Sequence, residues 1–240
     1  MFRVIAIDGP ASSGKGTVAA FLAKELQYMH VDSGLFYRYF ARFYKETCED
    51  TSVVGALAAQ LLAQPTAEVV KFFEPVLEFF YQKSDHAHII PVLKTESCAQ
   101  VASKISTEPN VRQCVNTAIR SIDKNLVIDG RDTTTVIFPD ADVKLFITAN
   151  VQTRAKRRMW EDETRISHST LGKNDVPATE RSTLQHYVDA IVKRDQQDAT
   201  RSVAPLICPE DAIVVDTSEM NTSQMCEHVM QIVKVRLNIG

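Results

Sequence analysis

Short apolar runs rich in Val and Ile recur along the chain, and each run ends in polar residues or glycine. Continuous apolar runs of this kind are typical of parallel strands that are buried on both faces. Open α/β sheets bind ligands at the carboxyl ends of their strands, so the polar residues after these runs are the first site candidates. The pattern predicts five strands, at Val4–Ile7, Met29–Val31, Leu126–Ile128, Val143–Ile147 and Ile213–Val215.

Apolar residues at helical spacing lie between the predicted strands. Alternating strand and helix signals are typical of an α/β fold with right-handed crossovers. We therefore expect a three-layer sandwich around a five-stranded parallel sheet. The helices are predicted over Val18–Leu26, Leu35–Lys45, Val54–Ala63, Val111–Ile122, Thr153–Asp162, Gln185–Asp198 and Ser223–Leu237.

Two regions interrupt this alternation. Residues from about 50 to 105 form a stretch too long for a crossover loop, so we expect an inserted subdomain there. The stretch is rich in aromatic residues between Phe72 and Tyr81, and Ala87–Leu93 is predicted as a strand. The second region, Trp160–Ser182, is polar and contains Gly172 and Pro177, which predicts a mobile loop or lid.

Composition and charge narrow the class of protein. The chain has 240 residues, which suits one α/β domain, and a formal net charge of −3, which disfavours a general binder of nucleic acid or membrane surfaces. The five cysteines are odd in number and scattered, so we expect reduced thiols and no disulfide framework. The six histidines are also scattered along the chain. No apolar segment approaches the ~18 residues that a membrane span requires. We expect a soluble cytoplasmic protein.

The strongest motif is a glycine-rich loop between the first predicted strand and the helix after it. Glycines let the backbone turn tightly, so that several N–H groups and the positive helix end can hold phosphate oxygens. Lys15 adds a point charge that can follow the β- and γ-phosphates of ATP during transfer. This phosphate loop, our predicted ATP site, consists of Gly9, Pro10, Ala11, Ser12, Ser13, Gly14, Lys15, Gly16 and Thr17.

The residue after the lysine differs from the usual phosphate loop, in which a Ser or Thr hydroxyl binds Mg²⁺. Here that residue is Gly16, and Thr17 follows it. This form is similar to the loop of nucleoside-monophosphate kinases, which implies a metal held largely through water and disfavours a switch GTPase. A carboxylate for the metal should follow a neighbouring strand, and Asp129 does so. We therefore predict Mg²⁺ as cofactor, contacted by Asp129 through water.

Arginines follow two of the predicted strands and end a predicted helix. Arg38 and Arg131 follow the second and third strands, and Arg194 and Arg201 lie around the end of the helix before the last strand. Guanidinium groups bind phosphate in a bidentate manner. Several arginines beside a phosphate loop therefore predict a second substrate that itself carries a phosphate.

Four motifs together resemble those of bacterial cytidylate kinases. They are G-P-A-S-S-G-K-G-T, V-D-S-G-x-x-Y-R, V-I-D-G-R-D with F-P-D-A, and R-D-x-x-D-x-x-R-x-V-A-P-L. The resemblance extends from Ile5 to about Ser218 and is weakest between residues 50 and 95. It implies one P-loop kinase domain over residues 1–240, with a monophosphate-binding insert near 36–110 and a lid near 153–182.

The resemblance also implies roles for the residues of the acceptor site. A carboxylate such as Asp132 can accept a hydrogen bond from the cytosine amino group, and Arg112 can donate to an acceptor on the base. Uracil would face Asp132 with no proton to share, and an unpaired buried polar group costs ~1–3 kcal/mol. The implied contacts are Arg38, Arg131 and Arg201 to the acceptor phosphate, Ser103, Arg112 and Asp132 to the cytosine edge with Ser33 nearby, and Arg194 and Asp198 to the ribose.

The lid and one turn complete the predicted site. Arg154 and Arg158 lie four residues apart on one helix face, and the resemblance implies that they close over the donor phosphates, with Arg157 as a further candidate. Together with Lys15, Arg131 and Asp129 they make up the predicted catalytic group. After Asp132 the family usually has Met-Gly-Thr, whereas this chain has three threonines, 133–135, which would stiffen the turn that carries Asp132.

The expected reaction is transfer of the γ-phosphoryl group of Mg·ATP to CMP or dCMP by a monomeric enzyme that binds neither nucleic acid nor membranes. Related kinases with another acceptor, such as UMP, shikimate or dephospho-coenzyme A, are the nearest alternatives, and the arginine-rich acceptor side disfavours shikimate. A nucleotide-dependent switch or regulatory ATPase is an alternative of a different class. Gly16 and the additional arginines disfavour it.

Overall fold

A single parallel sheet forms the centre of the molecule. The computed structural model describes residues 2–47, 51–81, 89–93, 95–168 and 183–239. In these residues the strand order is β2-β3-β1-β4-β5, and each neighbouring pair is parallel. The prediction of a five-stranded parallel sheet is confirmed. The strands are β1 (Val4–Asp8), β2 (Met29–Asp32), β3 (Leu126–Gly130), β4 (Val143–Thr148) and β5 (Ile213–Asp216).

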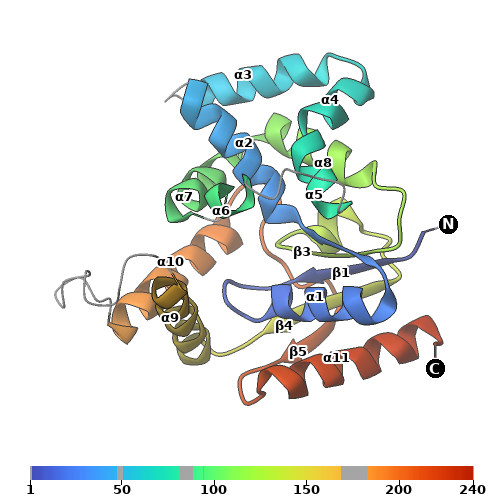
Figure 1. Cartoon of the computed structure of the whole chain (residues 1–240), viewed down its shortest axis with the longest axis vertical. Helices are drawn as coiled ribbons and strands as arrows, with labels where there is room; N and C mark the ends of the chain where they lie inside the picture. Colours follow the sequence, from blue (N-terminus) through green and yellow to red (C-terminus); the bar gives the residue numbers. More distant parts are fainter. Residues whose placement is uncertain (1, 48–50, 82–88, 94, 169–182, 240) are drawn as a thin grey trace.

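Helices join the strands and surround the sheet. Within the described residues, none of them combines the length and apolar character that a membrane span requires. Figure 1 shows α2 to α8 gathered at the top of the view and α11 at the bottom, with the strands between them. The helices are α1 (Lys15–Leu26), α2 (Ser33–Thr47), α3 (Thr51–Leu62), α4 (Thr66–Phe72), α5 (Glu74–Phe80), α6 (Ile89–Leu93), α7 (Glu96–Ile105), α8 (Pro109–Arg120), α9 (Val151–His168), α10 (Leu184–Thr200), α11 (Thr222–Leu237) and a π-helical turn, η2 (Thr133–Ile137).

The two faces of the sheet bury different hydrophobic clusters, because successive side chains of a strand point to opposite faces. Ile5 and Ile7 of β1 pack in one cluster with residues of α1 and α11. Ala6, between them, packs in the other cluster with residues of α2, α5 and α8. The unbroken apolar runs of the sequence reflect this burial on both faces.

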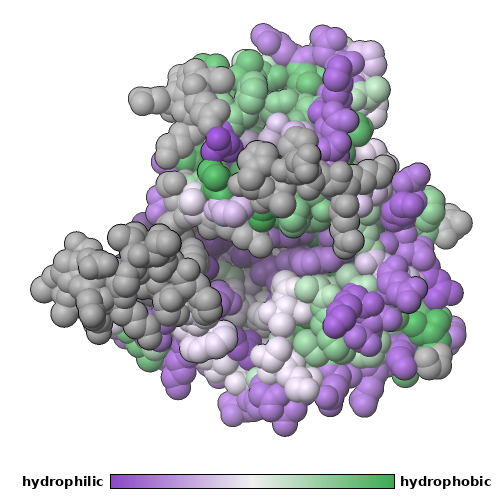
Figure 2. Space-filling view, viewed as in Figure 1, coloured by the Kyte–Doolittle hydropathy of each residue, from purple (hydrophilic) through white to green (hydrophobic). Residues whose placement is uncertain are grey.

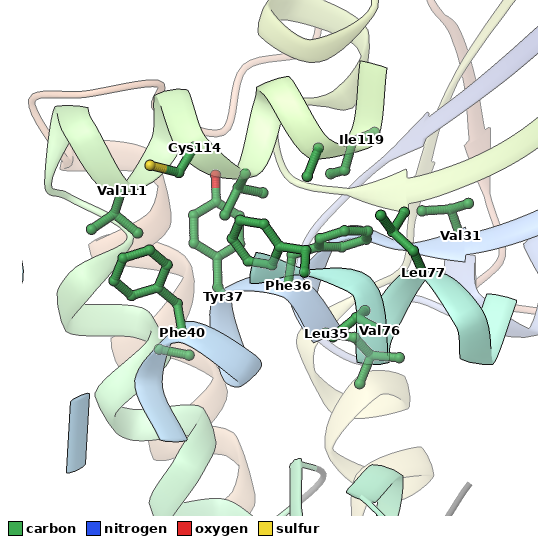
Figure 3. Packing of buried hydrophobic residues seen from close by; sticks show 14 of the residues in the cluster. Val31, Leu35, Phe36, Tyr37, Phe40, Val76, Leu77, Val111, Cys114 and Ile119 are labelled. Atoms are coloured by element: carbon green, nitrogen blue, oxygen red, sulfur yellow. The ribbon is translucent and has the colours of Figure 1, made fainter. Parts of the chain in front are cut away.

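The aromatic stretch of the insert belongs to the second cluster. Figure 3 shows the side chains of Phe36 and Phe40 from α2 packed among residues of α5 and α8. The Phe36 ring centroid lies 5.5 Å from that of Phe73 and 5.7 Å from that of Phe80. Aromatic rings at such distances add to the free energy gained by burial. The aromatic residues therefore hold the helices after α2 onto the sheet.

Two predictions about local structure are wrong in the described residues. Residues 89–93, predicted as part of a strand, form the helix α6, in which Ile90 and Leu93 are buried in the second cluster at a spacing of three. Tertiary packing here overrides the strand preference of an Ile- and Val-rich segment. Residues 163–168, predicted as the start of a mobile loop or lid, are not a loop but continue α9 to His168. Ala155 of α9 packs against Val188 and Ile191 of α10, and the remaining residues of the predicted lid, 169–182, lie outside the described residues.

Candidate active site

A cleft of about 1200 Å³ opens at the carboxyl ends of β1, β2 and β3. In Figure 2, hydrophilic residues gather in the recess between the upper and lower parts of the molecule. The phosphate loop lines part of the cleft, and residues from the ends of β2 and β3 and from α2, α7, α8, α9 and α10 line the rest. The cleft therefore joins the two predicted substrate sites in one space.

The phosphate loop needs glycine at positions 9 and 14. Gly9 and Gly14 have φ angles of +153° and +94°, which side chains rarely adopt. A Cβ on Gly9 would lie 2.0 Å from the backbone oxygen of Ile147, so no other residue fits there without moving β4. Gly14 caps α1, and the described part of the chain gives that helix end no side-chain cap. The first N–H groups of α1 are thus available to an anion.

Lys15 is buried at the base of the cleft, where its Nζ donates a hydrogen bond to the Pro10 carbonyl over 3.1 Å. Burial, together with the smaller effect of the Arg131 charge, lowers the pKa of Lys15 to about 7, while the charge of Asp129 opposes the shift. A phosphate group beside Lys15 would restore its charged form. The lysine is therefore poised to gain charge when an anion enters the cleft.

Two carboxylates lie side by side where β2 and β3 end. Asp32 and Asp129 are register partners in the sheet. Burial raises the pKa of Asp32, and the charge of Asp129 raises it further, against the opposing charges of Arg38 and His30. A Cβ on Gly16 would lie 3.7 Å from Asp129 Oδ2, so this oxygen faces the residue that follows Lys15. Carboxylate oxygens beside a phosphate loop suit a hydrated divalent cation.

A buried ion pair also lines the cleft. Arg112 Nη2 donates to Asp132 Oδ2, and both side chains are almost fully buried. Arg112 also donates to the Ser106 carbonyl over 2.7 Å, and Ser103 lines the cleft beside them. The Tyr37 ring lies under the Arg112 guanidinium, 5.5 Å from its Cζ. This pair offers one acceptor and one donor to a planar polar ligand.

A second ion pair joins β3 to α10. Arg131 Nε lies 2.7 Å from Asp198 Oδ2. Burial alone would raise the pKa of Asp198, but the positive charges of Arg131, Arg194 and Arg201 outweigh it and lower the pKa. Arg201 also lies 3.8 Å from Asp132. The arginines predicted to bind the acceptor phosphate thus share the cleft with the two carboxylates.

The turn that carries Asp132 is held by a buried carboxylate of β1. Asp8 accepts hydrogen bonds from the backbone N–H and the hydroxyl of both Thr133 and Thr134, over 2.6–2.9 Å. Burial raises the pKa of Asp8, and the bonds from the Thr134 hydroxyl and from the N–H groups of Thr133 and Thr134 oppose the rise. Thr133 and Thr134 have no positive φ, so the turn forms without the glycine usual in the related family. The threonines brace the turn through their hydroxyls.

The three predicted lid arginines of α9 have different surroundings. Arg158 lines the cleft, and its contact with donor phosphates stays a prediction. Arg154 is buried, and it contacts Asp195 over 2.6 Å and the Ala11 carbonyl over 3.1 Å rather than lining the cleft. Arg157 donates to the carbonyls of Ser13 and Thr217. Arg154 and Arg157 therefore fasten α9 to the phosphate loop in this structure.

The cleft brings together nearly all of the predicted site residues. Gly9 and Pro10 belong to the phosphate loop but, like Arg154, do not line the cleft among the described residues. Sequence reasoning missed His30, Asp32 and Asp195. The position of Asp32 directly after a strand, like that of Asp129, was a usable signal, whereas nothing in the sequence indicated the contact of Asp195 with α9. The predicted residues that line the cleft are Ala11, Ser12, Ser13, Gly14, Lys15, Gly16, Thr17, Ser33, Arg38, Ser103, Arg112, Asp129, Arg131, Asp132, Arg158, Arg194, Asp198 and Arg201.

Comparisons with known proteins agree on one family. The family model described as "Cytidylate kinase" matches residues 5–235. The cytidylate kinase of Geobacillus sp. (strain WCH70) is 35% identical over 235 residues, which cover 97% of each chain. That of Bdellovibrio bacteriovorus is 35% identical over 240 residues, which cover 99% of this chain and 100% of the relative. A solved structure, "Crystal structure of TT1252 from Thermus thermophilus", is 16% identical, and the match covers 98% of each chain with a TM-score of 0.40.

Proposed function

The chain belongs to the cytidylate kinase family, and from this premise we propose that it transfers the γ-phosphoryl group of ATP to CMP and dCMP, giving ADP and CDP or dCDP. The observation that carries the proposal is a single cleft that both the phosphate loop and the Arg112–Asp132 pair line. A cleft of this kind can hold two nucleotides with their phosphates facing each other.

The donor is ATP in this proposal. Its phosphates would occupy the turn between Gly9 and Gly14, where the first N–H groups of α1 have no side-chain cap. Lys15 would leave the Pro10 carbonyl and contact the β- and γ-phosphates. The acceptor oxygen of CMP is already anionic, so no general base is required. Positioning and charge stabilisation by Lys15, Arg131 and Arg158 supply the catalysis.

The acceptor site would bind both the base and the phosphate of a cytosine nucleotide. Asp132 would accept from the cytosine amino group, and Arg112 would donate to the ring. Ser33 and Ser103 line the cleft as well and would lie near the base. The ribose would contact Arg194 and Asp198, and the phosphate would bind Arg38, Arg131 and Arg201.

Magnesium fits the carboxylates at the edge of the sheet. In the described residues, no cluster of three or more His, Cys, Asp or Glu side chains could enclose an ion. In the proposal the nucleotide phosphates hold the ion, and Asp129 contacts it through water with Asp32 beside it. When bound, the ion would neutralise charge on the donor phosphates.

The proposal also gives roles to the insert and to the lid. Residues 36–110 would act as the monophosphate-binding insert, and residues 153–182 as the lid. Their closure over bound nucleotides would exclude water, which otherwise competes as the acceptor. We propose that the enzyme acts as a cytoplasmic monomer on free nucleotides.

The experiment is a ³¹P NMR assay of the products formed from Mg·ATP and CMP. Wild-type enzyme should produce ADP and CDP. Replacing Lys15 with Met should lower kcat by at least about 100-fold and leave CMP binding unchanged, because the lysine contacts only the donor. Lys24→Met, on the exposed face of the same helix, is the matched control and should behave as wild type. Phosphate release without CDP would overturn the proposal in favour of an ATPase.

A further inference from the structure

His30 holds the carboxylate of Asp129 by a direct hydrogen bond. The distance from His30 Nε2 to Asp129 Oδ1 is 2.8 Å. An ionised carboxylate can only accept, so Nε2 carries the hydrogen in this contact. The Asp129 side chain is 9% exposed and that of His30 is 31% exposed. His30 thus lies between Asp129 and solvent at the outer edge of the sheet.

Strand geometry explains why these groups meet. His30 and Asp32 are two residues apart in β2, so both side chains point to the same face of the sheet. Asp32 is the register partner of Asp129 in β3, the neighbouring strand. Val31, between His30 and Asp32, and Ile128, which directly precedes Asp129, pack in the hydrophobic cluster on the opposite face of the sheet. His30, Asp32 and Asp129 therefore share the face that α1 covers.

The two oxygens of Asp129 have different surroundings. Oδ1 accepts from His30, whereas Oδ2 faces Gly16 of the phosphate loop. Asp32 is fixed separately, because its Oδ1 accepts from the Gly34 N–H over 2.9 Å. Two neighbouring carboxylates repel each other when both are ionised, so each needs a partner to hold its orientation. His30 is the partner that the structure gives Asp129.

We propose that His30 is a positioning residue, which orients Asp129 so that Oδ2 points toward the metal–nucleotide complex. This inference rests on the proposed function, because it takes Asp129 as the carboxylate on the metal side. His30 touches neither substrate nor metal in this account. Groups that orient carboxylates and imidazoles around a metal commonly change metal affinity or activity by about 10–100-fold when they are removed.

The experiment measures Mn²⁺ binding by EPR in the presence of ADP, in addition to turnover with Mg·ATP and CMP. His30→Leu should weaken Mn²⁺ binding about tenfold and lower kcat, while KM for CMP stays unchanged. His30→Gln can place an N–H near the same point and should restore most of the affinity. His30→Asn keeps a polar side chain but is too short, so it should behave like His30→Leu. The matched control, His228→Leu, is exposed on α11 and should bind Mn²⁺ as wild type.

The outcomes separate the inference from the proposed function. If His30→Leu and His30→Asn bind Mn²⁺ with ADP as tightly as wild type, His30 has no positioning role, whatever the wild-type enzyme phosphorylates. If wild type fails to phosphorylate CMP but the two variants still lose Mn²⁺ affinity and Gln restores it, the proposed function fails and the positioning role stands. Equal losses in the Gln, Asn and Leu variants would also overturn the inference, because a hydrogen bond would then not be the cause.

Discussion

Arg131 at the end of β3 and Asp198 in α10 form an ion pair with a separation of 2.7 Å between Nε and Oδ2. The pair links the sheet edge to the helix that carries Arg194, another predicted substrate contact. Arg131 Nη1 donates to the Gly130 carbonyl over 3.1 Å, so the guanidinium is oriented from both sides. A phosphate ligand would meet an arginine that is already in place.

Replacing Asp198 with Asn should therefore impair use of CMP. The change removes the negative charge that offsets Arg131, Arg194 and Arg201, and it loosens the orientation of Arg131. We expect KM for CMP to rise about tenfold, equivalent to about 1.4 kcal/mol, with a smaller change in KM for ATP. Steady-state kinetics measure both. Asp189→Asn, on the exposed face of the same helix, should leave both values unchanged, and an unaltered KM for CMP in Asp198→Asn would contradict the role of the pair.

The protein should take up a proton when it binds a nucleotide at alkaline pH. In the free protein the pKa of Lys15 is about 7, so most of the lysine is neutral at pH 8. Bound phosphate favours the charged form, so the lysine gains a proton on binding at pH 8 but already has one at pH 6. ATP affinity should consequently fall as pH rises above 7, by up to about tenfold per unit. Calorimetry in two buffers of different ionisation enthalpy measures the uptake, which Lys15→Met should abolish. Identical heats in both buffers at pH 8 would show that Lys15 keeps its proton in the free state.

The three consecutive threonines should differ in their contribution to stability. The hydroxyls of Thr133 and Thr134 donate to buried Asp8, whereas the buried Thr135 hydroxyl has no partner among the described residues. Replacing Thr134 with Val should lower the free energy of unfolding by about 1–3 kcal/mol, since it leaves an Asp8 oxygen short of a donor. Thr135→Val is the matched control and should be neutral or slightly stabilising. Urea denaturation compares them, and equal effects would argue against the bracing role.

Replacing Arg154 should mainly lower the stability of the protein, whereas replacing Arg158 should mainly lower kcat. Removing Arg154 leaves Asp195 without its 2.6 Å partner, so Arg154→Ala should lower the free energy of unfolding by about 2 kcal/mol. Arg158 is partly exposed, and its side-chain ion pairs are 3.6 and 3.7 Å long. Arg158→Ala should change stability by less than about 0.5 kcal/mol but reduce kcat at least about tenfold. Thermal unfolding and turnover of the two variants test this, and the reverse pattern would mean that the contacts have been misinterpreted.

The sheet and most of its helices could be predicted from the sequence because burial on both faces leaves a direct pattern of apolar residues. Val4–Ile7 and Leu126–Ile128 indicated β1 and β3 to within two residues at either end. The segment 89–93 could not be assigned in this way. Its strand preference is local, while the burial of Ile90 and Leu93 against other helices depends on the tertiary structure.

The site residues were predictable where a motif or a strand end marked them. Lys15, Arg131 and Asp132 follow strands whose carboxyl ends must meet in a parallel sheet. The orientations of the side chains were not predictable. Sequence spacing placed Arg154 with Arg158 on one helix face, but a contact with Asp195, 41 positions further along the chain, turns Arg154 toward the phosphate loop.

The central claim is that the Arg112–Asp132 pair in the cleft recognises cytosine. The most direct test is a coupled assay for ADP with Mg·ATP and each of CMP, dCMP, UMP, AMP and GMP. The account predicts fast turnover with CMP and dCMP, and kcat/KM lower by about tenfold to a hundredfold or more with UMP, whose 4-oxo group would face Asp132 without a proton. Comparable or faster turnover with UMP, AMP or GMP would contradict cytosine recognition by this pair.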